Sequence, residues 1–225
     1  MFTTRFQAFI RRNAQRLAGV IGRLPITPNQ VTVTGMVITF IAAVLTGFGN
    51  LLAAAIVLAF AGTFDILDGA LARATKRMYP YGAFLDSTTD RFSEAAIYVG
   101  LAAFFLYQAP PAWWTRLTAV GCLVALAGSM LVSYVRARAQ SLGFTCETGI
   151  FARPERVVVT ILGLLLGLIV GPEVLALVVA LLAVVTTFTA IQRVNEVWQQ
   201  ARAQRRPRGE EKAGQPGSAG ERSAP

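Results

Sequence analysis

The sequence predicts an all-α integral membrane protein with six transmembrane helices, an N-terminal amphipathic juxtamembrane helix and both termini in the cytoplasm. Of its 225 residues, 54% are hydrophobic and 15% are charged, whereas a soluble domain carries about 25% charged residues. The mean hydropathy is +0.53. Six apolar stretches are long enough to cross a bilayer as helices, and the basic residues gather at one set of their ends.

The composition excludes several classes of function. Histidine is absent, so the chain has no histidine base, no Ser-His or Cys-His nucleophile and no histidine-containing metal site. Cys122 and Cys146 form no CxxC pair, and two cysteines build neither a zinc ribbon nor a disulfide framework. In so apolar a chain, the net charge of +9 indicates the cytoplasmic flanks of a membrane protein and no nucleic-acid partner.

Residues 1–24 are predicted to form an amphipathic helix rather than a signal peptide or a span. Phenylalanine and aliphatic residues recur there at helical spacing, with arginines between them. Such a helix lies in the headgroup layer of the membrane or packs against the cytoplasmic ends of the bundle, and the two placements are compatible.

The predicted spans lie in a domain of residues 25–200 and are separated by turn-forming residues. Gly47-Phe48-Gly49-Asn50 ends the first span, Ala109-Pro110-Pro111 follows the third, and Gly171-Pro172-Glu173 follows the fifth. Residues 201–225 are rich in Arg, Gly, Glu, Pro and Ser, which predicts a disordered, basic and polar tail. The spans cover about 31–49, 51–73, 83–107, 113–135, 154–171 and 173–193.

The distribution of basic residues sets the predicted orientation. On one side of the membrane, the turns between spans carry Arg116 as their only basic residue. Arginines and lysines are frequent on the other side, in the N-terminal segment, the turn after Arg73, the ends of later spans and the tail. By the positive-inside rule, both termini are cytoplasmic and the number of spans is even. We therefore expect a protein of the plasma (inner) membrane whose site faces the cytoplasm.

Four carboxylates fall within the second and third predicted spans. Asp65 and Asp68 are three residues apart and Asp86 and Asp90 are four apart, so each pair lies on one face of its helix. A carboxylate at such depth costs about 2.5–3.5 kcal/mol on insertion scales, and four together repel one another. One or two divalent cations would relieve this repulsion. Ligands that are all oxygen favour Mg²⁺, Mn²⁺ or Ca²⁺ over zinc.

Two other interpretations of the carboxylates stay open at this point. They also suit a cation or proton relay in a transporter, or structural ion pairs with Arg73 and Arg91. Gly69 follows Asp68 directly and favours a ligand site, because glycine lets a ligand approach the backbone. Taken without the carboxylates, Gly69 and Gly82 would indicate ordinary helix packing.

These residues form a pattern that resembles the signature of the CDP-alcohol phosphotransferase family at eight fixed positions: Asp65-x2-Asp68-Gly69-x2-Ala72-Arg73-x8-Gly82-x3-Asp86-x3-Asp90. The resemblance covers about residues 25–195. It implies two Mg²⁺ or Mn²⁺ ions held by Asp65, Asp68 and Asp86. Asp90 would complete this metal cluster and act as the general base on the acceptor hydroxyl.

The resemblance also implies a binding site for the CDP-lipid. Gly69, Arg73 and Gly82 would line it together with Asp68. Pro28-Asn29-x2-Thr32 resembles a family segment that contributes to the nucleotide pocket, here through Asn29 and Thr32. Divalent metals offset the charge that develops as the pyrophosphate is cleaved. A carboxylate accepts the hydroxyl proton, so no histidine is required.

A second basic cluster at three predicted helix ends bears on the acceptor alcohol. Arginines gathered from several helices bind a phosphate dianion, although any one of them taken alone suits the positive-inside rule. Two of the stretches resemble those of phosphatidylinositol-phosphate synthases, which join CDP-diacylglycerol to inositol 1-phosphate and release CMP. Position 136 is Arg where bacterial members often have Lys. The stretches are Ser133-Tyr134-Val135-Arg136-Ala137-Arg138-Ala139 and Arg153-Pro154-Glu155-Arg156, with Arg193 at the end of the sixth span.

By this resemblance, the inositol phosphate would be held by Ser133, Arg136, Arg138, Arg153 and Arg193. Arg156 would brace them through Glu155 or a neighbour. Other acceptor and donor chemistries remain as alternatives: an archaetidylinositol-phosphate synthase with a different lipid, an enzyme that uses glycerol 3-phosphate, or, outside the family, a cation- or proton-coupled transporter. Metal-dependent release of CMP distinguishes the enzymes from the transporter.

The resemblance implies that the protein is a homodimer. It also implies that membrane lipids are its partners and that one of them, CDP-diacylglycerol, is the donor substrate. Gly163-x3-Gly167-x3-Gly171 forms a face of small residues on the fifth predicted span. Such a face permits close contact between helices, either between two copies of the chain or within one copy.

Overall fold

The computed structural model describes residues 27–74, 79–146, 148–149 and 152–213, and the regular structure in these ranges is helical. The six predicted helices of the domain are present, whereas the predicted helix of residues 1–24 lies outside the described residues. The helices are α2 (Pro28–Gly47), α3 (Leu51–Ala74), α4 (Pro80–Tyr107), α5 (Trp113–Ser141), α6 (Arg153–Ile169) and α7 (Pro172–Ala213).

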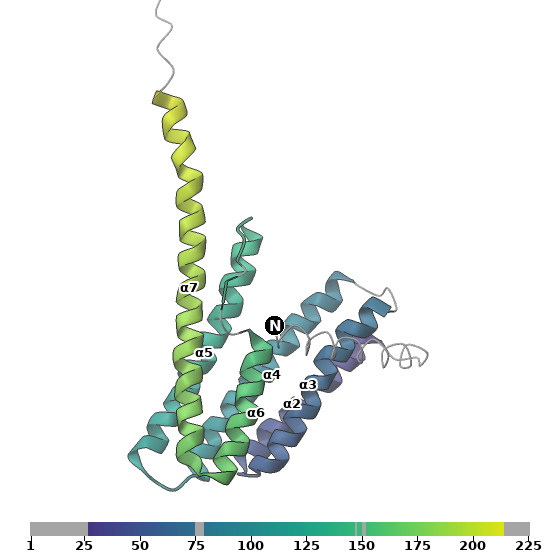
Figure 1. The fold of residues 1–225 in the computed structure, drawn as a ribbon. Helices are drawn as coiled ribbons and strands as arrows, with labels where there is room; N and C mark the ends of the chain where they lie inside the picture. The colour runs from purple at the N-terminus through teal and green to yellow at the C-terminus, as the bar shows by residue number, and fades with distance from the viewer. Residues whose placement is uncertain (1–26, 75–78, 147, 150–151, 214–225) are drawn as a thin grey trace, which may run out of the picture.

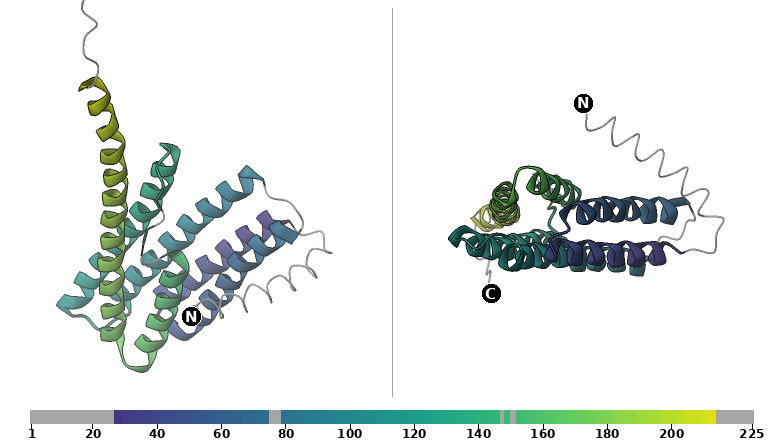
Figure 2. Two further views of the ribbon diagram at one scale, coloured as in Figure 1. Left: turned by 45° about the horizontal axis from the view of Figure 1, so that its top comes forward. Right: turned by 90° about the horizontal axis from the view of Figure 1, so that it is seen from below.

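The helices form two layers, with α7, α6 and α3 in one layer and α5, α4 and α2 in the other (Figure 2). The layers meet at their outer helices, because α7 packs against α5 and α3 packs against α2. α6 and α4 are the middle helices of the two layers. Among the described residues, no Cα atom of α6 lies within 8 Å of a Cα atom of α4. The interior between the middle helices is therefore filled by side chains.

Local sequence explains where the helices begin and turn. At α2, the Thr27 hydroxyl accepts a hydrogen bond from the Gln30 amide (3.3 Å) and the Gln30 side chain accepts one from the Thr27 amide (2.9 Å). This reciprocal cap is followed by Pro28 in the first turn, where a missing amide hydrogen is harmless. Gly49 and Gly171 have φ of +81° and +138° and form the turns before α3 and α7.

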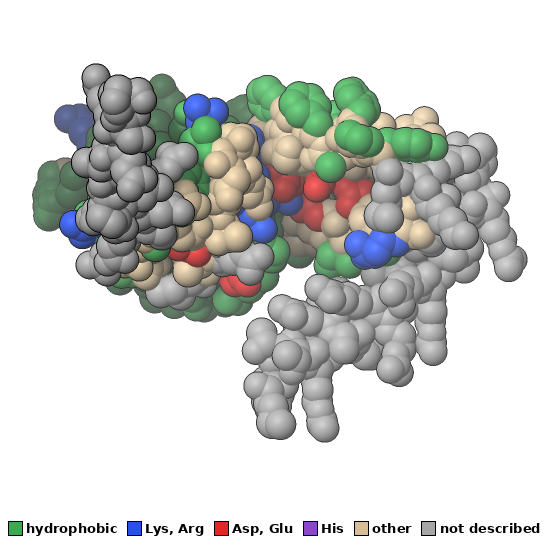
Figure 3. Space-filling view, turned by 90° about the horizontal axis from the view of Figure 1, so that it is seen from above, with side chains coloured by type: hydrophobic (Ala, Val, Ile, Leu, Met, Phe, Trp, Pro, Cys, Tyr) green, Lys and Arg blue, Asp and Glu red, His purple; other side chains and the backbone are tan. Residues whose placement is uncertain are grey.

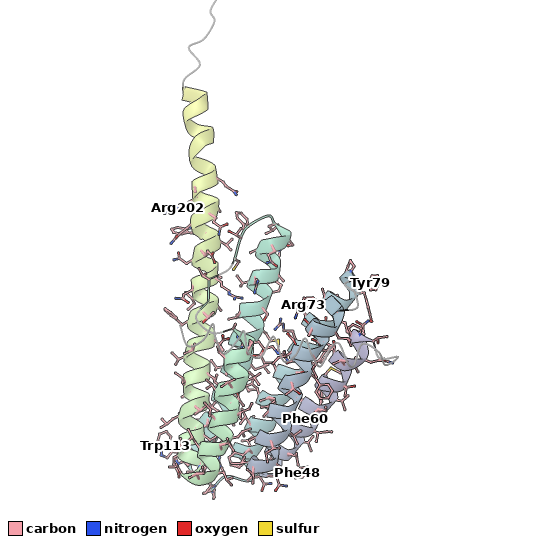
Figure 4. All side chains as sticks on the ribbon, turned by 45° about the vertical axis from the view of Figure 1, so that its right-hand side comes forward. Phe48, Phe60, Arg73, Tyr79, Trp113 and Arg202 are labelled. Atoms are coloured by element: carbon pink, nitrogen blue, oxygen red, sulfur yellow. The ribbon has the colours of Figure 1, made fainter. Side chains whose placement is uncertain are left out.

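The two ends of the bundle differ in chemistry. Arg73 and Tyr79 lie at one end, and Phe48 and Trp113 lie at the other (Figure 4). We call the first the site end. α2, α4 and α6 begin at the site end, and α3 and α5 end there. α7 also ends on this side and projects well beyond the other helices (Figure 1).

Length and composition mark four of the six helices as membrane spans. They are Pro28–Gly47, Leu51–Arg73, Trp113–Ser141 and Pro172–Gln204. The two middle helices do not meet the same criteria, because α4 carries four charged residues between Asp86 and Glu94, and α6 has only 17 residues. Each of these two helices lies between two apolar helices, α4 between α2 and α5 and α6 between α3 and α7. The chain is an integral membrane protein.

The small residues of α6 pack within the chain. A Cβ atom at Gly163 would lie 2.8 Å from Val178 of α7, and one at Gly167 would lie 2.9 Å from Leu175. Both distances are too short for a real side chain, so these glycines bring α6 against α7. The intramolecular alternative for this face is therefore correct, and the face gives no support to a dimer.

The prediction of a disordered tail from residue 201 is wrong for its first part, because α7 continues to Ala213. The residues after 200 include Ala, Arg, Gln, Glu and Lys, which have high helix propensity and extend a helix that has already formed. One turn is also stabilised by the Arg202 guanidinium, which lies 4.3 Å from the centre of the Trp198 ring. A polar composition is compatible both with a solvent-exposed helix and with a disordered segment, so composition alone could not distinguish the two for residues 201–213.

The contact between α2 and α4 leads to a testable prediction. A Cβ atom at Gly100 of α4 would overlap the Ala43 carbonyl of α2. Gly100→Ala is therefore expected to lower the free energy of unfolding by about 1–3 kcal/mol, measured as a lower melting temperature in detergent. Gly62→Ala is the control, since a Cβ there meets no described atom within 4 Å and alanine favours helix. Equal melting temperatures for the two variants would contradict the close approach.

Candidate functional site

The predicted carboxylates converge between the two layers at the site end. Figure 3 looks onto this end and shows acidic side chains on the floor of a hollow. Asp65 and Asp68 come from the second half of α3, and Asp86 and Asp90 come from the first half of α4. α3 ends and α4 begins at the site end. The carboxylates of the two helices therefore lie at a similar depth in the bundle, although they are far apart in the sequence.

Arg153 joins carboxylates of two helices. Its Nη1 atom lies 2.7 Å from Oδ2 of Asp65 and 2.6 Å from Oδ1 of Asp90. The three side chains are partly buried, with 18%, 33% and 18% of their surfaces exposed. A single guanidinium from the first residue of α6 therefore provides the positive charge that this pair of carboxylates requires.

The contact of Arg153 differs from its predicted place among phosphate-binding arginines. Its guanidinium is in the carboxylate cluster, because two anions from neighbouring helices lie within its reach. The alternative of ion pairs with Arg73 and Arg91 is not seen: in the described part of the chain, ion pairs within 4 Å are made by Arg153 and Arg156. In the described ranges, no group of three or more Asp, Glu, His or Cys side chains is arranged as a metal site.

Asp68 is held by hydrogen bonds. It is 6% exposed, and its Oδ2 accepts a hydrogen bond of 2.7 Å from the Thr32 hydroxyl of α2. Its Oδ1 accepts one of 2.5 Å from the Gly69 amide. These bonds fix one oxygen-rich wall of the site between α2 and α3. Asp86 is exposed and leaves its carboxylate free to face a ligand.

A cavity of about 230 Å³ lies beside these carboxylates. It opens between the start of α2, the end of α3 and the start of α4. All six residues predicted to bind the nucleotide line it, together with Asp86. The sequence did not single out Tyr79, an aromatic residue in the turn between the two carboxylate-bearing helices. The lining residues are Pro28, Asn29, Thr32, Asp68, Gly69, Ala72, Arg73, Tyr79, Gly82, Ala83 and Asp86.

Two glycines keep this cavity open. A Cβ atom at Gly82 would lie 3.4 Å from Oδ1 of Asn29, and one at Gly69 would lie 3.4 Å from Nη1 of Arg73. A larger residue at either position would narrow the cavity. The amide oxygen and the guanidinium therefore remain accessible from it.

The remaining predicted phosphate-binding residues occupy three different environments. Arg193 is 6% exposed; its Nε donates to the Thr148 carbonyl (2.9 Å) and its Nη1 to the Val132 carbonyl (2.6 Å). Arg136 and Arg138 are exposed on α5. Ser133 donates a hydrogen bond of 3.3 Å to a main-chain carbonyl one turn earlier. Thus Arg193 ties α7 to α5, and the two exposed arginines are the accessible cations.

The segment between α5 and α6 is bound to α7. Thr145 donates through its amide to the Gln200 side chain (3.1 Å), and Gln200 donates back to the Thr145 carbonyl (2.7 Å). The Thr148 hydroxyl donates to Glu196 at 2.5 Å. Cys146 lies between these contacts, and burial raises the pKa of its thiol, which keeps it protonated at neutral pH. The part of α7 that carries Glu196 and Gln200 therefore holds this segment in place by hydrogen bonds.

The sequence missed the partner of Arg156. Arg156 was expected to act through Glu155 or a neighbour, but its Nε lies 2.5 Å from Oε1 of Glu94 and its Nη2 lies 3.2 Å from Oε2. The available signal was the spacing of Glu94, which follows Asp90 by four residues and so continues the acidic face of α4.

Known proteins are similar to this chain in sequence and in fold. An archaetidylinositol phosphate synthase of Methanothermobacter thermautotrophicus is 37% identical over 194 residues, which cover 86% of this chain and 93% of the relative. A phosphatidylinositol phosphate synthase of Mycobacterium tuberculosis is 34% identical over 202 residues, covering 85% and 88%.

Two solved structures of the phosphatidylinositol phosphate synthase of Mycobacterium tuberculosis are also similar. The one with CDP-DAG bound has a TM-score of 0.76 and 32% identity, covering 83% of this chain and 94% of that chain. The one in complex with manganese and citrate has a TM-score of 0.76 and 32% identity, covering 82% and 88%. The family model for CDP-alcohol phosphatidyltransferase matches residues 25–191. This chain belongs to the CDP-alcohol phosphatidyltransferase family.

Proposed function

We propose that the protein transfers the phosphatidyl group of CDP-diacylglycerol to a hydroxyl of inositol 1-phosphate and releases CMP. The observation that carries this proposal is the cavity of about 230 Å³, since it is lined by two of the four aspartates, Asp68 and Asp86, and by the guanidinium-bearing Arg73. The relatives named as phosphatidylinositol and archaetidylinositol phosphate synthases support the choice of acceptor. We place the site on the cytoplasmic side, and the homodimer remains a prediction.

The residues around the cavity suit a CDP headgroup. Asn29 offers an amide to a base or sugar, and Arg73 offers a guanidinium to the diphosphate. Thr32 holds Asp68 in place by its hydrogen bond. Gly69 and Gly82 leave the main chain accessible to phosphate oxygens. The lipid tails would stay beside the apolar outer faces of the bundle.

The carboxylates have the donor chemistry that divalent cations prefer, because each donor atom is oxygen. In the described structure Arg153 occupies two of them, and they would have to draw together to hold an ion. Asp65, Asp68, Asp86 and Asp90 would hold Mg²⁺ or Mn²⁺, and manganese is present in a similar structure. Such ions neutralise the charge that develops on CMP and the phosphoryl oxygens. Arg153 would then leave its two carboxylates and become available to the acceptor phosphate.

Asp90 is the proposed general base. Its carboxylate lies at the level of the cluster, and Arg153, the proposed first contact of the acceptor phosphate, is bonded to it. An acceptor held by Arg153 would present its hydroxyl near Asp90, which would accept the proton as the new ester bond forms. Arg136 and Arg138 would add positive charge from α5. Ser133 and Arg193 would complete the site from α5 and α7.

The first experiment compares CMP release by the purified protein in detergent, with CDP-diacylglycerol and Mg²⁺. The acceptors are inositol 1-phosphate, free inositol, glycerol 3-phosphate and none. We expect CMP release with inositol 1-phosphate alone and its loss with EDTA. Release with glycerol 3-phosphate would contradict the assignment of the acceptor. A strong preference for an ether-linked CDP-lipid would replace the donor and favour an archaetidylinositol phosphate synthase.

Asp90→Asn tests the base. The amide keeps the size of the side chain but accepts no proton, so kcat is expected to fall by about 10²–10⁴-fold with little change in KM for CDP-diacylglycerol. Steady-state kinetics of CMP release measure both constants. An equal rise in that KM would show that Asp90 serves the donor site instead.

Arg153→Gln tests the exchange between arginine and metal. Removing a guanidinium that competes for Asp65 and Asp90 is expected to strengthen Mn²⁺ binding by about fivefold, because a partly exposed ion pair contributes about 1 kcal/mol. Electron paramagnetic resonance of free Mn²⁺ measures the affinity without any turnover. Arg138→Gln on the exposed surface of α5 is the control and should leave it unchanged. Weaker Mn²⁺ binding by Arg153→Gln would argue against competition at these carboxylates.

A further inference from the structure

The middle helices of the two layers are joined by two ion pairs, one helical turn apart. Asp90 and Glu94 are four residues apart on α4, and Arg153 and Arg156 are three residues apart on α6. Arg153 bonds Asp90 at the cluster, and Arg156 bonds Glu94 deeper between the layers. No described Cα atoms of α4 and α6 lie within 8 Å of each other, so side chains connect the two helices: these ion pairs toward the site end, and beyond them the apolar core that Leu101 of α4 and Leu164 of α6 share.

The deeper pair has the more restrictive geometry. Arg156 and Glu94 form a two-pronged contact at 2.5 Å and 3.2 Å, and only 3% and 8% of their side chains are exposed. Arg153 and Asp90 are each 18% exposed and share a single nitrogen contact. A planar guanidinium bound through two nitrogens fixes both distance and orientation. Arg156 therefore fixes α6 at a point three residues from its first residue.

The surroundings of this pair leave no room for substrate. The cavity beside it has about 30 Å³, which is enough for about one water molecule. Thr39, Ser93 and Tyr98 contribute polar atoms to its wall. The pair is thus separate from the larger cavity beside Asp68 and Asp86, and its influence on a reaction must pass through the helices that carry it.

Stability alone does not account for such a pair. Two charges removed from water lose much of their hydration energy, and well-packed apolar residues of similar volume often give equal or greater stability. A buried pair nevertheless defines a single relative position of two helices, which a set of apolar contacts defines less sharply. Arg153 depends on that position, since it begins α6 and has no earlier turn of this helix to hold it.

We propose that Glu94 is a positioning residue: by binding Arg156 it fixes α6 opposite α4, and so directs Arg153 toward Asp90 and the acceptor phosphate. The part of this proposal that concerns the acceptor phosphate rests on the proposed function. The part that concerns the position of α6 is independent of it, so the two parts are tested by separate measurements.

The test uses the double variant Glu94→Leu/Arg156→Leu, which removes both charges and leaves neither unpaired. We expect it to fold, with a melting temperature in detergent and Mn²⁺ affinity near those of wild type. Its KM for inositol 1-phosphate should rise and its kcat fall, together lowering kcat/KM by about 10²-fold, the effect of misplacement by about 1 Å. Its KM for CDP-diacylglycerol should be unchanged. Tyr98→Phe, which removes a hydroxyl from the same small cavity, is the matched control and should behave as wild type.

A distance measurement makes the test independent of turnover. Spin labels at Val99 of α4 and Val158 of α6, both on exposed surfaces, report the separation of the middle helices by double electron–electron resonance. We expect a narrow distribution in wild type and Tyr98→Phe, and a broader or shifted one in the double variant. An unchanged distribution would overturn the proposal, and so would wild-type kinetics in the double variant. If wild type shows no CMP release with inositol 1-phosphate, the proposed function fails while the distance measurement still decides the role of Glu94.

Discussion

A carboxylate in the interior of a membrane protein requires a cation or hydrogen-bond donors, and this requirement governs the arrangement of the helices. Asp65, Asp90 and Glu94 face the space between the layers, where water cannot solvate them as it does at a surface. Arg153 and Arg156, from the beginning of α6, form ion pairs with all three. The short middle helix α6 is thereby held opposite α4 although their backbones remain apart. The larger cavity, lined by α2, α3 and α4, lies beside these charged residues.

The apolar helices provide the frame for this polar interior. α2, α3, α5 and α7 have the composition of membrane spans, and their mutual contacts close the two layers at both edges. The charged residues of α4 lie between the site end and the middle of this helix, and those of α6 lie in its first turn, also at the site end. This division allows hydrolytically sensitive chemistry on a headgroup to proceed at one end of the bundle, while the rest of its surface remains compatible with lipid tails.

Much of the fold was predictable because hydropathy and turn residues act locally. The predicted start of the second span coincides with that of α3, and α2 and α6 each end two residues before a glycine of positive φ, Gly49 and Gly171, that allows the chain to turn. The aspartate spacing predicted that the four carboxylates face one another, since periodicity on two consecutive helices determines which faces meet; their role in binding a metal stays a prediction. The partner of Arg156 and the contacts of Arg153 and Arg193 depend on helices distant in sequence. No local pattern distinguishes an arginine bound to a carboxylate or a carbonyl from one that awaits a phosphate.

The attachment of the α5–α6 segment to α7 has a consequence for how acceptor preference changes in evolution. The segment follows Arg138 and precedes Arg153, both assigned to the acceptor, yet Glu196 and Gln200 hold it in shape from more than forty residues away. A graft of this segment from a relative with a different acceptor would lack its supporting surface unless the matching turns of α7 were grafted with it. Under the proposed function, acceptor preference would therefore be inherited as a loop together with a distant stretch of helix, because a change in either part alters the contacts of the other.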